Sequence, residues 1–199
     1  MKHDRRHDIL TAAMELFSKK GFRGTTTRDL AYQAGVNEAI IFRHFNNKEE
    51  LYSAILQHKA GENSDAHCED LEKLASGTDD AKFFETIGRT FLERHERDST
   101  FMRLLLFSAL EGHQLSEMFV TIMTVRNPLA KYIKRRIDEG AFRPMNPEIA
   151  ARGFFGMFAS FVLWQEVFGL KQTHPHDREE VVRTFVSIFI SGISNDQTT

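Results

Sequence analysis

Residues 25–51 of this 199-residue chain, TTTRDLAYQAGVNEAIIFRHFNNKEEL, predict two short helices joined by a tight turn. The threonines at 25–27 offer hydroxyl oxygens that cap the free amides of a helix over about residues 28–34, and Asn37 caps a second helix in the same way. Between them, Ala-Gly-Val at 34–36 supplies a small residue, a glycine free to adopt positive φ and an apolar residue for the corner. This spacing is typical of a helix-turn-helix.

The second of these helices has an apolar face and a face that is free for contacts. Ile41 and Phe45 are four residues apart and are expected to face the core, which turns Ala39, Phe42 and Arg43 outward. A helix-turn-helix places the N-terminal part of its second helix in the major groove of DNA, so the outward residues are placed to meet base edges. The alternative is a helical hairpin within a larger bundle.

A third amphipathic helix is predicted just upstream, over residues 5–20. Its apolar stripe consists of Ile9, Ala12, Ala13, Leu16 and Phe17. The helix ends at Lys19-Lys20-Gly21, with cations in the last turn and a glycine stop. Three helices can enclose a small core, which favours a helix-turn-helix domain over a lone hairpin.

Residues 9–51, ILTAAMELFSKKGFRGTTTRDLAYQAGVNEAIIFRHFNNKEEL, resemble the N-terminal region of the tetracycline-repressor (TetR) family of transcriptional regulators. The matching features are the first helix ending in KKGF, the following TT, the AxxAGV turn and the FRHFNNKEEL close. Residues 139–158, EGAFRPMNPEIAARGFFGMF, are similar to a turn and helix in the regulatory domains of such proteins. The expected fold is all-α, with a three-helix, helix-turn-helix DNA-binding domain at 1–50 and a larger helical ligand-binding and dimerisation domain at 51–199.

The resemblance also implies which side chains contact DNA. The implied DNA-binding residues are Thr27, Arg28, Asn37, Glu38, Ala39, Phe42, Arg43, His44 and Lys48. Arg28 and Arg43 can each bind a guanine through two hydrogen bonds. Thr27, expected to cap its helix, and Lys48, at the start of the next helix, are expected near phosphates together with His44.

One of these positions departs from the family pattern, and two others carry alternatives. Phe42 replaces a tyrosine that many members have, so its contact is apolar, for example to a thymine methyl. Glu38 is an anion on a surface that meets DNA: it accepts a hydrogen bond from a cytosine amine, or it pairs with Arg43 or Arg28. The alternative for His44 is a solvated surface imidazole.

The net charge of −2 is low for a DNA-binding protein, but it is unevenly distributed. Residues 1–58 hold nine Lys or Arg against seven Asp or Glu, a balance of +2, whereas residues 59–199 hold 17 against 21, a balance of −4. Attraction for DNA phosphates is therefore local and modest. Two DNA-binding domains, called reading heads below, are needed for tight binding to DNA.

Other features favour a cytoplasmic protein. The first residues, MKHDRRHD, are charged rather than a signal peptide, and no apolar run approaches the length of a membrane span. The single cysteine, Cys68, fits a reducing compartment. Its acidic neighbours in AHCEDLEK oppose a thiolate, which argues against redox sensing.

The remainder of the chain predicts helices at about 48–74, 79–97, 100–110, 116–139, 147–168 and 177–193. Most of the 18 phenylalanines follow residue 82. Phenylalanine and methionine form a deformable apolar lining, so we expect an apolar or aromatic small-molecule effector. The candidate lining residues are Phe84, Phe91, Met102, Leu105, Phe119, Met123, Phe154, Phe158 and Trp164. The alternative for each is plain core or dimer interface.

The helices at about 147–168 and 177–193 are the candidates for a homodimer interface. The first is apolar on nearly all sides and contains Gly153 and Gly156, which permit close approach of a partner helix. A two-fold dimer presents two reading helices and therefore requires palindromic double-stranded DNA. We expect a ligand-responsive repressor that the effector releases from its operator.

An enzyme is the competing class. His174, His176 and Asp177 suggest a metal site, but they lie in a predicted loop without a second ligand pair. No phosphate-binding glycine loop and no GxSxG motif occurs in the sequence. We therefore expect no catalytic residues, no metal and no cofactor.

Overall fold

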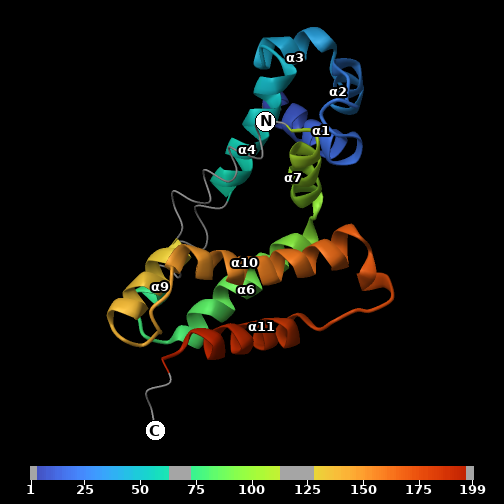
Figure 1. The fold of residues 1–199 in the computed structure, drawn as a ribbon. Coiled ribbons are helices and arrows are strands. Elements are labelled where there is room, and N and C mark those ends of the chain that lie inside the picture. The colour runs from blue at the N-terminus through green and yellow to red at the C-terminus, as the bar shows by residue number, and fades with distance from the viewer. Residues whose placement is uncertain (1–3, 63–72, 113–127, 196–199) are drawn as a thin grey trace. The chain divides into compact units, whose positions relative to one another are not determined.

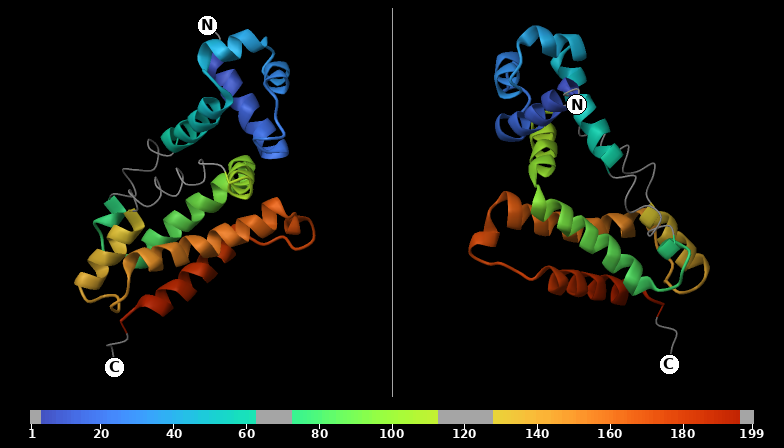
Figure 2. Two further views of the ribbon diagram at one scale, coloured as in Figure 1. Left: turned by 45° about the horizontal axis from the view of Figure 1, so that its top comes forward. Right: turned by 180° about the vertical axis from the view of Figure 1, so that it is seen from behind.

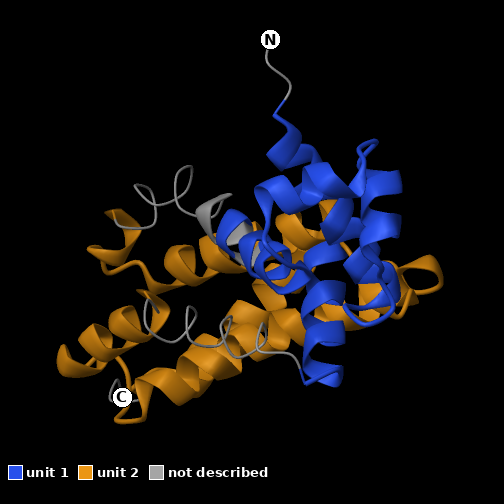
Figure 3. Cartoon of the chain, turned by 90° about the horizontal axis from the view of Figure 1, so that it is seen from above, with its two compact units in different colours: residues 1–66, 100–124 blue, residues 67–99, 125–199 orange. Residues whose placement is uncertain are grey.

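The computed structural model describes residues 4–62, 73–112 and 128–195, and over these ranges the protein is helical (Figure 1). The one described β-type pairing is an isolated antiparallel bridge between Phe142 and Ser194. The expected all-α fold is confirmed. Contacts divide the chain into two compact units: unit 1 comprises Met1–Ala66 with Thr100–Thr124, and unit 2 comprises His67–Ser99 with Val125–Thr199 (Figure 3). The predicted functional boundary at residue 50 remains a prediction.

The described residues of unit 1 contain five helices that share one core. They are α1 (Arg5–Lys20), α2 (Thr27–Gln33), α3 (Glu38–His44), α4 (Lys48–Glu62) and α7 (Thr100–Leu110). The helix α1 packs against α2, α4 and α7, because its predicted apolar stripe faces inward. Phe17 is completely buried, and its ring lies 4.7 Å from that of Tyr52 on α4. The helices α4 and α7 thus both pack against the three-helix domain expected from the sequence.

Local chemistry sets the ends of these helices. Gly21 ends α1 at φ +72°, and Gly35 occupies the α2–α3 turn at φ +63°, as predicted. The prediction that Thr27 caps α2 is wrong: Thr26 is the N-cap, and it forms a capping box with Asp29. The acidic residue three positions after Thr26 favours it as the cap, since the two side chains satisfy each other's backbone amides.

Unit 2 is built on α6 (Asp80–Arg97), α9 (Pro128–Asp138), α10 (Pro147–Val162) and α11 (Arg178–Ile193). The helix α10 continues into a π-helical turn, Leu163–Val167, and a short 3₁₀ helix, Leu170–Gln172, follows. Figure 2 shows α10 and α11 running alongside each other, and α6 packs against both. Pro147 occupies the first turn of α10, and the side chain of Asn146 caps the helix.

The core of unit 2 is a cluster of aromatic rings. Phe84 is completely buried, and its ring centroid lies 5.1 Å from those of Phe154 and Phe189. Gly88 allows Phe158 to approach α6, since a Cβ at Gly88 would collide with the Phe158 ring. Apolar burial of this kind stabilises the unit mainly through the area that it removes from water.

Charged side chains hold the edges of the same unit. Asp80 accepts hydrogen bonds from Arg136 Nε and Nη2, both at 2.8 Å, and from the Tyr132 hydroxyl at 2.6 Å. Arg178 at the start of α11 pairs with Glu93 and Glu96 on α6, at 2.9 and 2.7 Å.

Across the described ranges, no helix is both long enough and apolar enough to cross a membrane.

Candidate nucleic-acid interface

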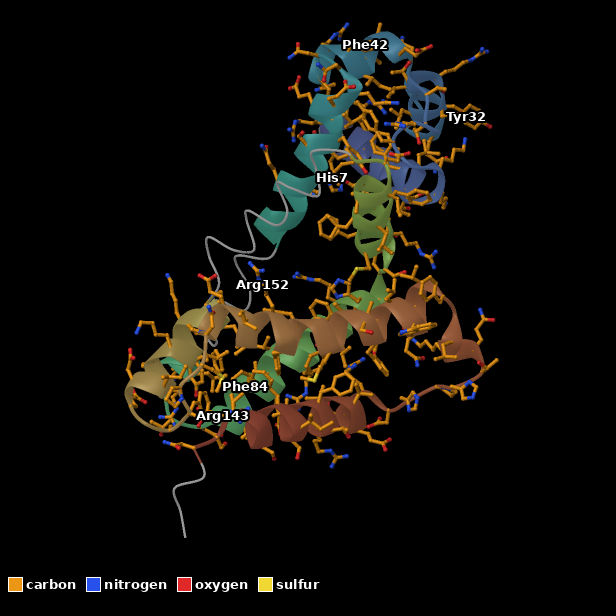
Figure 4. All side chains as sticks on the ribbon, in the orientation of Figure 1. His7, Tyr32, Phe42, Phe84, Arg143 and Arg152 are labelled. Atoms are coloured by element: carbon orange, nitrogen blue, oxygen red, sulfur yellow. The ribbon has the colours of Figure 1, made fainter. Side chains whose placement is uncertain are left out.

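The outward face of α3 carries the side chains that the sequence placed there. Ile41 and Phe45 are buried, whereas Ala39, Phe42 and Arg43 are exposed, as predicted. The Phe42 ring is 48% exposed, which is a large apolar surface to leave in water (Figure 4). Such a ring is suited to an apolar contact with a partner surface.

The first residues of α2 and α3 are joined by a hydrogen bond. The Thr27 hydroxyl donates to Glu38 Oε2 at 2.7 Å. Glu38 is therefore held by Thr27, and neither of the ion pairs considered for it, with Arg28 or Arg43, is present. Within the described part of the chain, neither arginine has an ion-pair partner. Both are exposed, so two positive charges are available on this surface.

Lys48 has a different environment from the other predicted phosphate contacts. Its ammonium group donates to the carbonyl oxygens of Phe22 and Thr25, at 2.7 and 2.9 Å, and lies 4.1 Å from the centroid of the Phe22 ring. Two of its three donors are thus engaged inside the protein. Lys48 holds the α1–α2 loop against the start of α4, and its contact with phosphate remains a prediction.

The same loop is also held by Glu111, which directly follows α7. The two carboxylate oxygens of Glu111 accept hydrogen bonds from the backbone amides of Phe22 and Arg23, at 2.9 and 3.2 Å. Sequence reasoning missed Glu111, because it lies 88 residues from Arg23 and belongs to no motif. The loop between the first two helices is therefore fixed by one cation and one anion.

Other residues of this surface complete the description. Asn37 caps α3, and its side chain accepts a hydrogen bond from the amide of Ile40 at 3.0 Å. His44 is half-buried beside Phe45. Hydrogen bonds from Thr26 to the carboxylate of Asp29 lower the pKa of that group. Tyr32, on α2, is 89% exposed (Figure 4).

The candidate effector residues do not form one site in the described structure. Phe84, Phe154 and Phe158 are completely buried in the aromatic core of unit 2, and Phe91 is half-buried beside His95. Trp164 is 54% exposed. Met102 and Leu105 are half-buried residues of α7 in unit 1. Phe119 and Met123, like Cys68, lie outside the described residues, and a ligand-binding role for any of these residues remains a prediction.

Described residues of unit 2 form an open groove that bears on the predicted dimer. It has a volume of about 430 Å³ and lies between the first half of α10 and the end of α11. Ile149, Gly153, Ile188 and Gly192 are among its lining residues. Ile149 and Ile188 are 68% and 59% exposed, so the walls of the groove are apolar.

His174 and His176 are exposed, as expected for a loop. Over the described ranges, no three His, Cys, Asp or Glu side chains are grouped in a way that would hold a metal ion.

Comparison with known proteins identifies the family. Residues 9–55 match the model of bacterial regulatory proteins of the tetR family, and residues 84–192 match the AefR-like transcriptional repressor C-terminal domain. The chain belongs to the TetR family. Members are transcriptional regulators, so this TetR-family chain is a DNA-binding regulator and not an enzyme. That the exposed surface of the α2–α3 pair contacts DNA remains a prediction.

Similar proteins agree with this TetR-family assignment. The HTH-type transcriptional regulator YvkB of Bacillus subtilis is 28% identical over 94% of this chain and 96% of its own. Two solved structures share the fold. FadR of Bacillus subtilis in complex with stearoyl-CoA has a TM-score of 0.70 and 19% sequence identity, over 94% of this chain and 98% of its own. AibR in complex with isovaleryl-CoA and operator DNA has a TM-score of 0.71 and 18% sequence identity, over 93% of this chain and 97% of its own.

Proposed function

We propose that this protein is a repressor that binds a palindromic operator as a homodimer and is released by a small, largely apolar effector. The observation that carries the proposal is the exposed face of α3, where Phe42 and Arg43 lie side by side while Ile41 and Phe45 anchor the helix in the core. Bacterial DNA lies in the cytoplasm, so we place the protein there.

The chemistry of this face suits the major groove. An arginine bonds the O6 and N7 atoms of a guanine with a geometry that other bases do not offer, and Arg43 and Arg28 are both free to do so. The Phe42 ring suits a thymine methyl, and Glu38 accepts a hydrogen bond from a cytosine amine. Glu38 already accepts a hydrogen bond from Thr27, so its side chain loses less conformational entropy when the protein binds DNA.

Two copies are required because each head has few charges with which to bind phosphate. The balance of residues 1–58 is only +2, which gives weak nonspecific binding. We assign the dimer contact to α10 with its π-helical extension and to α11, since their apolar groove and exposed isoleucines face solvent in a single copy. A two-fold axis between the copies then requires a palindromic operator.

Acyl-CoA thioesters are the first effector class to test. FadR of Bacillus subtilis and AibR were solved with stearoyl-CoA and isovaleryl-CoA, respectively. The aromatic composition of unit 2 is compatible with an acyl chain, which is recognised mainly by shape and apolar contact. Effector binding then favours a helix arrangement in which the two reading heads no longer fit adjacent major grooves.

Selection of binding sequences from random duplex DNA tests the DNA-binding part of the proposal. We expect a palindrome with a guanine in each half-site. Arg43→Ala should weaken binding to the selected operator about 5- to 150-fold, the effect of one lost bidentate contact, and should relax the preference for that guanine. Arg94→Ala, an exposed arginine of α6, is the matched control and should bind normally. Unchanged binding by Arg43→Ala would remove α3 from the interface.

A thermal-shift series with acyl-CoA thioesters of increasing chain length tests the effector. A ligand that binds the folded protein raises its melting temperature. Coupling between the sites is reciprocal, so a true effector must bind less tightly to the operator complex by the same factor with which it weakens operator binding. A thioester that binds equally well with and without operator is not the effector.

A further inference from the structure

We propose that Trp164 of each protomer inserts into the α10–α11 groove of a second copy, with Gly156 at the two-fold axis. The inference rests on the dimer proposed above and specifies its register. It starts from five positions on α10 and its π-helical extension: Ile149, Gly153, Gly156, Ser160 and Trp164. Their spacing of three or four residues places them on one face, and all five are exposed.

Within the described residues, no neighbouring side chain requires a glycine at either glycine position of this stripe. A helical glycine costs about 1 kcal/mol relative to alanine, and at Gly88 that cost is explained by the Phe158 ring, which fills the space of a side chain. A Cβ at Gly153 or Gly156 would meet nothing within 4 Å. Small residues on an exposed helix face permit the close approach of another helix, and the second copy is that helix.

The stripe is also symmetric about Gly156. Gly153 and Ser160 lie three and four residues to either side, and Ile149 and Trp164 lie seven and eight. A two-fold axis perpendicular to α10 aligns the two copies antiparallel, so that each position faces its mirror position. Small residues then meet at the centre, and Trp164 meets the partner's Ile149 at each end.

The α10–α11 groove lies beside Ile149, which is the position that the partner's Trp164 faces in this register. It is lined by Ile149 and Gly153 on α10 and by Ile188 and Gly192 on α11. In the antiparallel arrangement the partner's Trp164 lies over Ile149. The ring of Phe168 packs edge to face against Trp164 at 5.1 Å and is 62% exposed, so the two rings enter the groove together. Tryptophan anchors of this kind dominate many interfaces.

Trp164 is the only tryptophan of the chain, so its fluorescence reports directly on this contact. Sedimentation establishes the oligomeric state at each concentration. We expect blue-shifted emission from the dimer and red-shifted emission from the Gly156→Glu variant, which places two charges at the axis and should be a folded monomer by circular dichroism. A wild-type dimer that emits like a solvent-exposed indole contradicts the register but not the dimer, whereas a wild-type monomer contradicts both.

Disulfide trapping tests the register without relying on Gly156→Glu to fold. In a Cys68→Ser background, Gly156→Cys should give a covalent dimer under mild oxidation. Arg94→Cys, at an exposed residue of α6, should not. Efficient trapping through Arg94→Cys instead of Gly156→Cys overturns the proposal.

The contribution of Trp164 is measured by the dimer dissociation constant. We expect Trp164→Ala to raise it about 30-fold or more, as for other interface anchors, while the stability of the monomer changes little because the ring is largely exposed there. Leu170→Ala is the control, since Leu170 lies outside the stripe and should leave dimerisation unchanged. Equal effects of the two variants would place the contact elsewhere.

Discussion

The α1–α2 loop of unit 1 and the α6–α10 contact of unit 2 are stabilised by opposite means. The loop is held by polar groups, with Lys48 on two of its carbonyls and Glu111 on two of its amides. The helix contact is held by rings, with Phe84 at the centre and Phe158 pressed against Gly88. The same chemistry that suggests binding of an outside partner therefore also serves internal structure in each unit.

This difference matters for the candidate DNA-binding residues and for the candidate effector-binding residues. A lysine near a DNA-binding helix can bind DNA phosphate or stabilise the protein itself. A phenylalanine in a regulatory domain can likewise contact an effector or pack in the core. In this structure Lys48 has internal acceptors, and three of the candidate effector residues belong to a packed core. Substitutions can separate the two uses, because an internal role alters stability whether or not DNA or effector is present.

The largest effect is expected from Phe84→Ala. Removing a completely buried ring should lower the free energy of unfolding of unit 2 by about 3–5 kcal/mol, since it leaves a cavity among the surrounding rings. Leu170→Ala, at a side chain that is 37% exposed, is the control and should cost far less. Urea denaturation followed by Trp164 fluorescence measures both. A small loss for Phe84→Ala would mean that the ring lines an open pocket.

Gly88→Ala tests the same contact from the helix side. The added methyl group collides with the ring of Phe158, which is completely buried. We expect a loss of about 1–3 kcal/mol, the usual cost of overpacking. A stabilised variant would show that the core of unit 2 is loose enough to repack, as a ligand-accommodating core should be.

Lys48→Met tests the polar side of the comparison. The variant keeps the apolar stem but removes two charge-assisted hydrogen bonds to the loop, so we expect unit 1 to lose about 1.5–2 kcal/mol by circular dichroism. Lys19→Met, at an exposed lysine of α1, should be nearly neutral. If Lys48→Met weakens operator binding while stability is unchanged, Lys48 acts on phosphate rather than on the loop.

Much of unit 1 could be predicted from sequence because its signals are local. The glycines at 21 and 35, the cap at Asn37 and the spacing of Ile41 and Phe45 each act within one or two turns. Glu111 could not be found, since its partners lie far away in the sequence. The sequence also could not show whether Phe84 belongs to the core or lines a ligand pocket. Helical periodicity shows that a side chain faces inward, but not whether it packs against another ring or borders an empty space.

The smallest effect concerns a buried titratable group in unit 2. Burial lowers the pKa of His95 below its ordinary value of 6.5, although a contact of 2.8 Å with the Phe91 carbonyl opposes the shift. Above pH 6.5 the imidazole is neutral in both folded and unfolded states and adds no pH dependence. Below it, the unfolded chain takes up a proton more readily than the folded one, so stability falls as pH falls.

His95→Asn removes this dependence and keeps a donor near the position of Nδ1. Urea unfolding of both proteins at pH 7.5 and 5.5 gives the comparison. The wild type should lose more stability than the variant, by at most about 1.4 kcal/mol per pH unit below 6.5, which is the value for one proton. Equal losses would mean that His95 takes up a proton as readily in the folded protein as in the unfolded chain, so that burial in unit 2 does not lower its pKa.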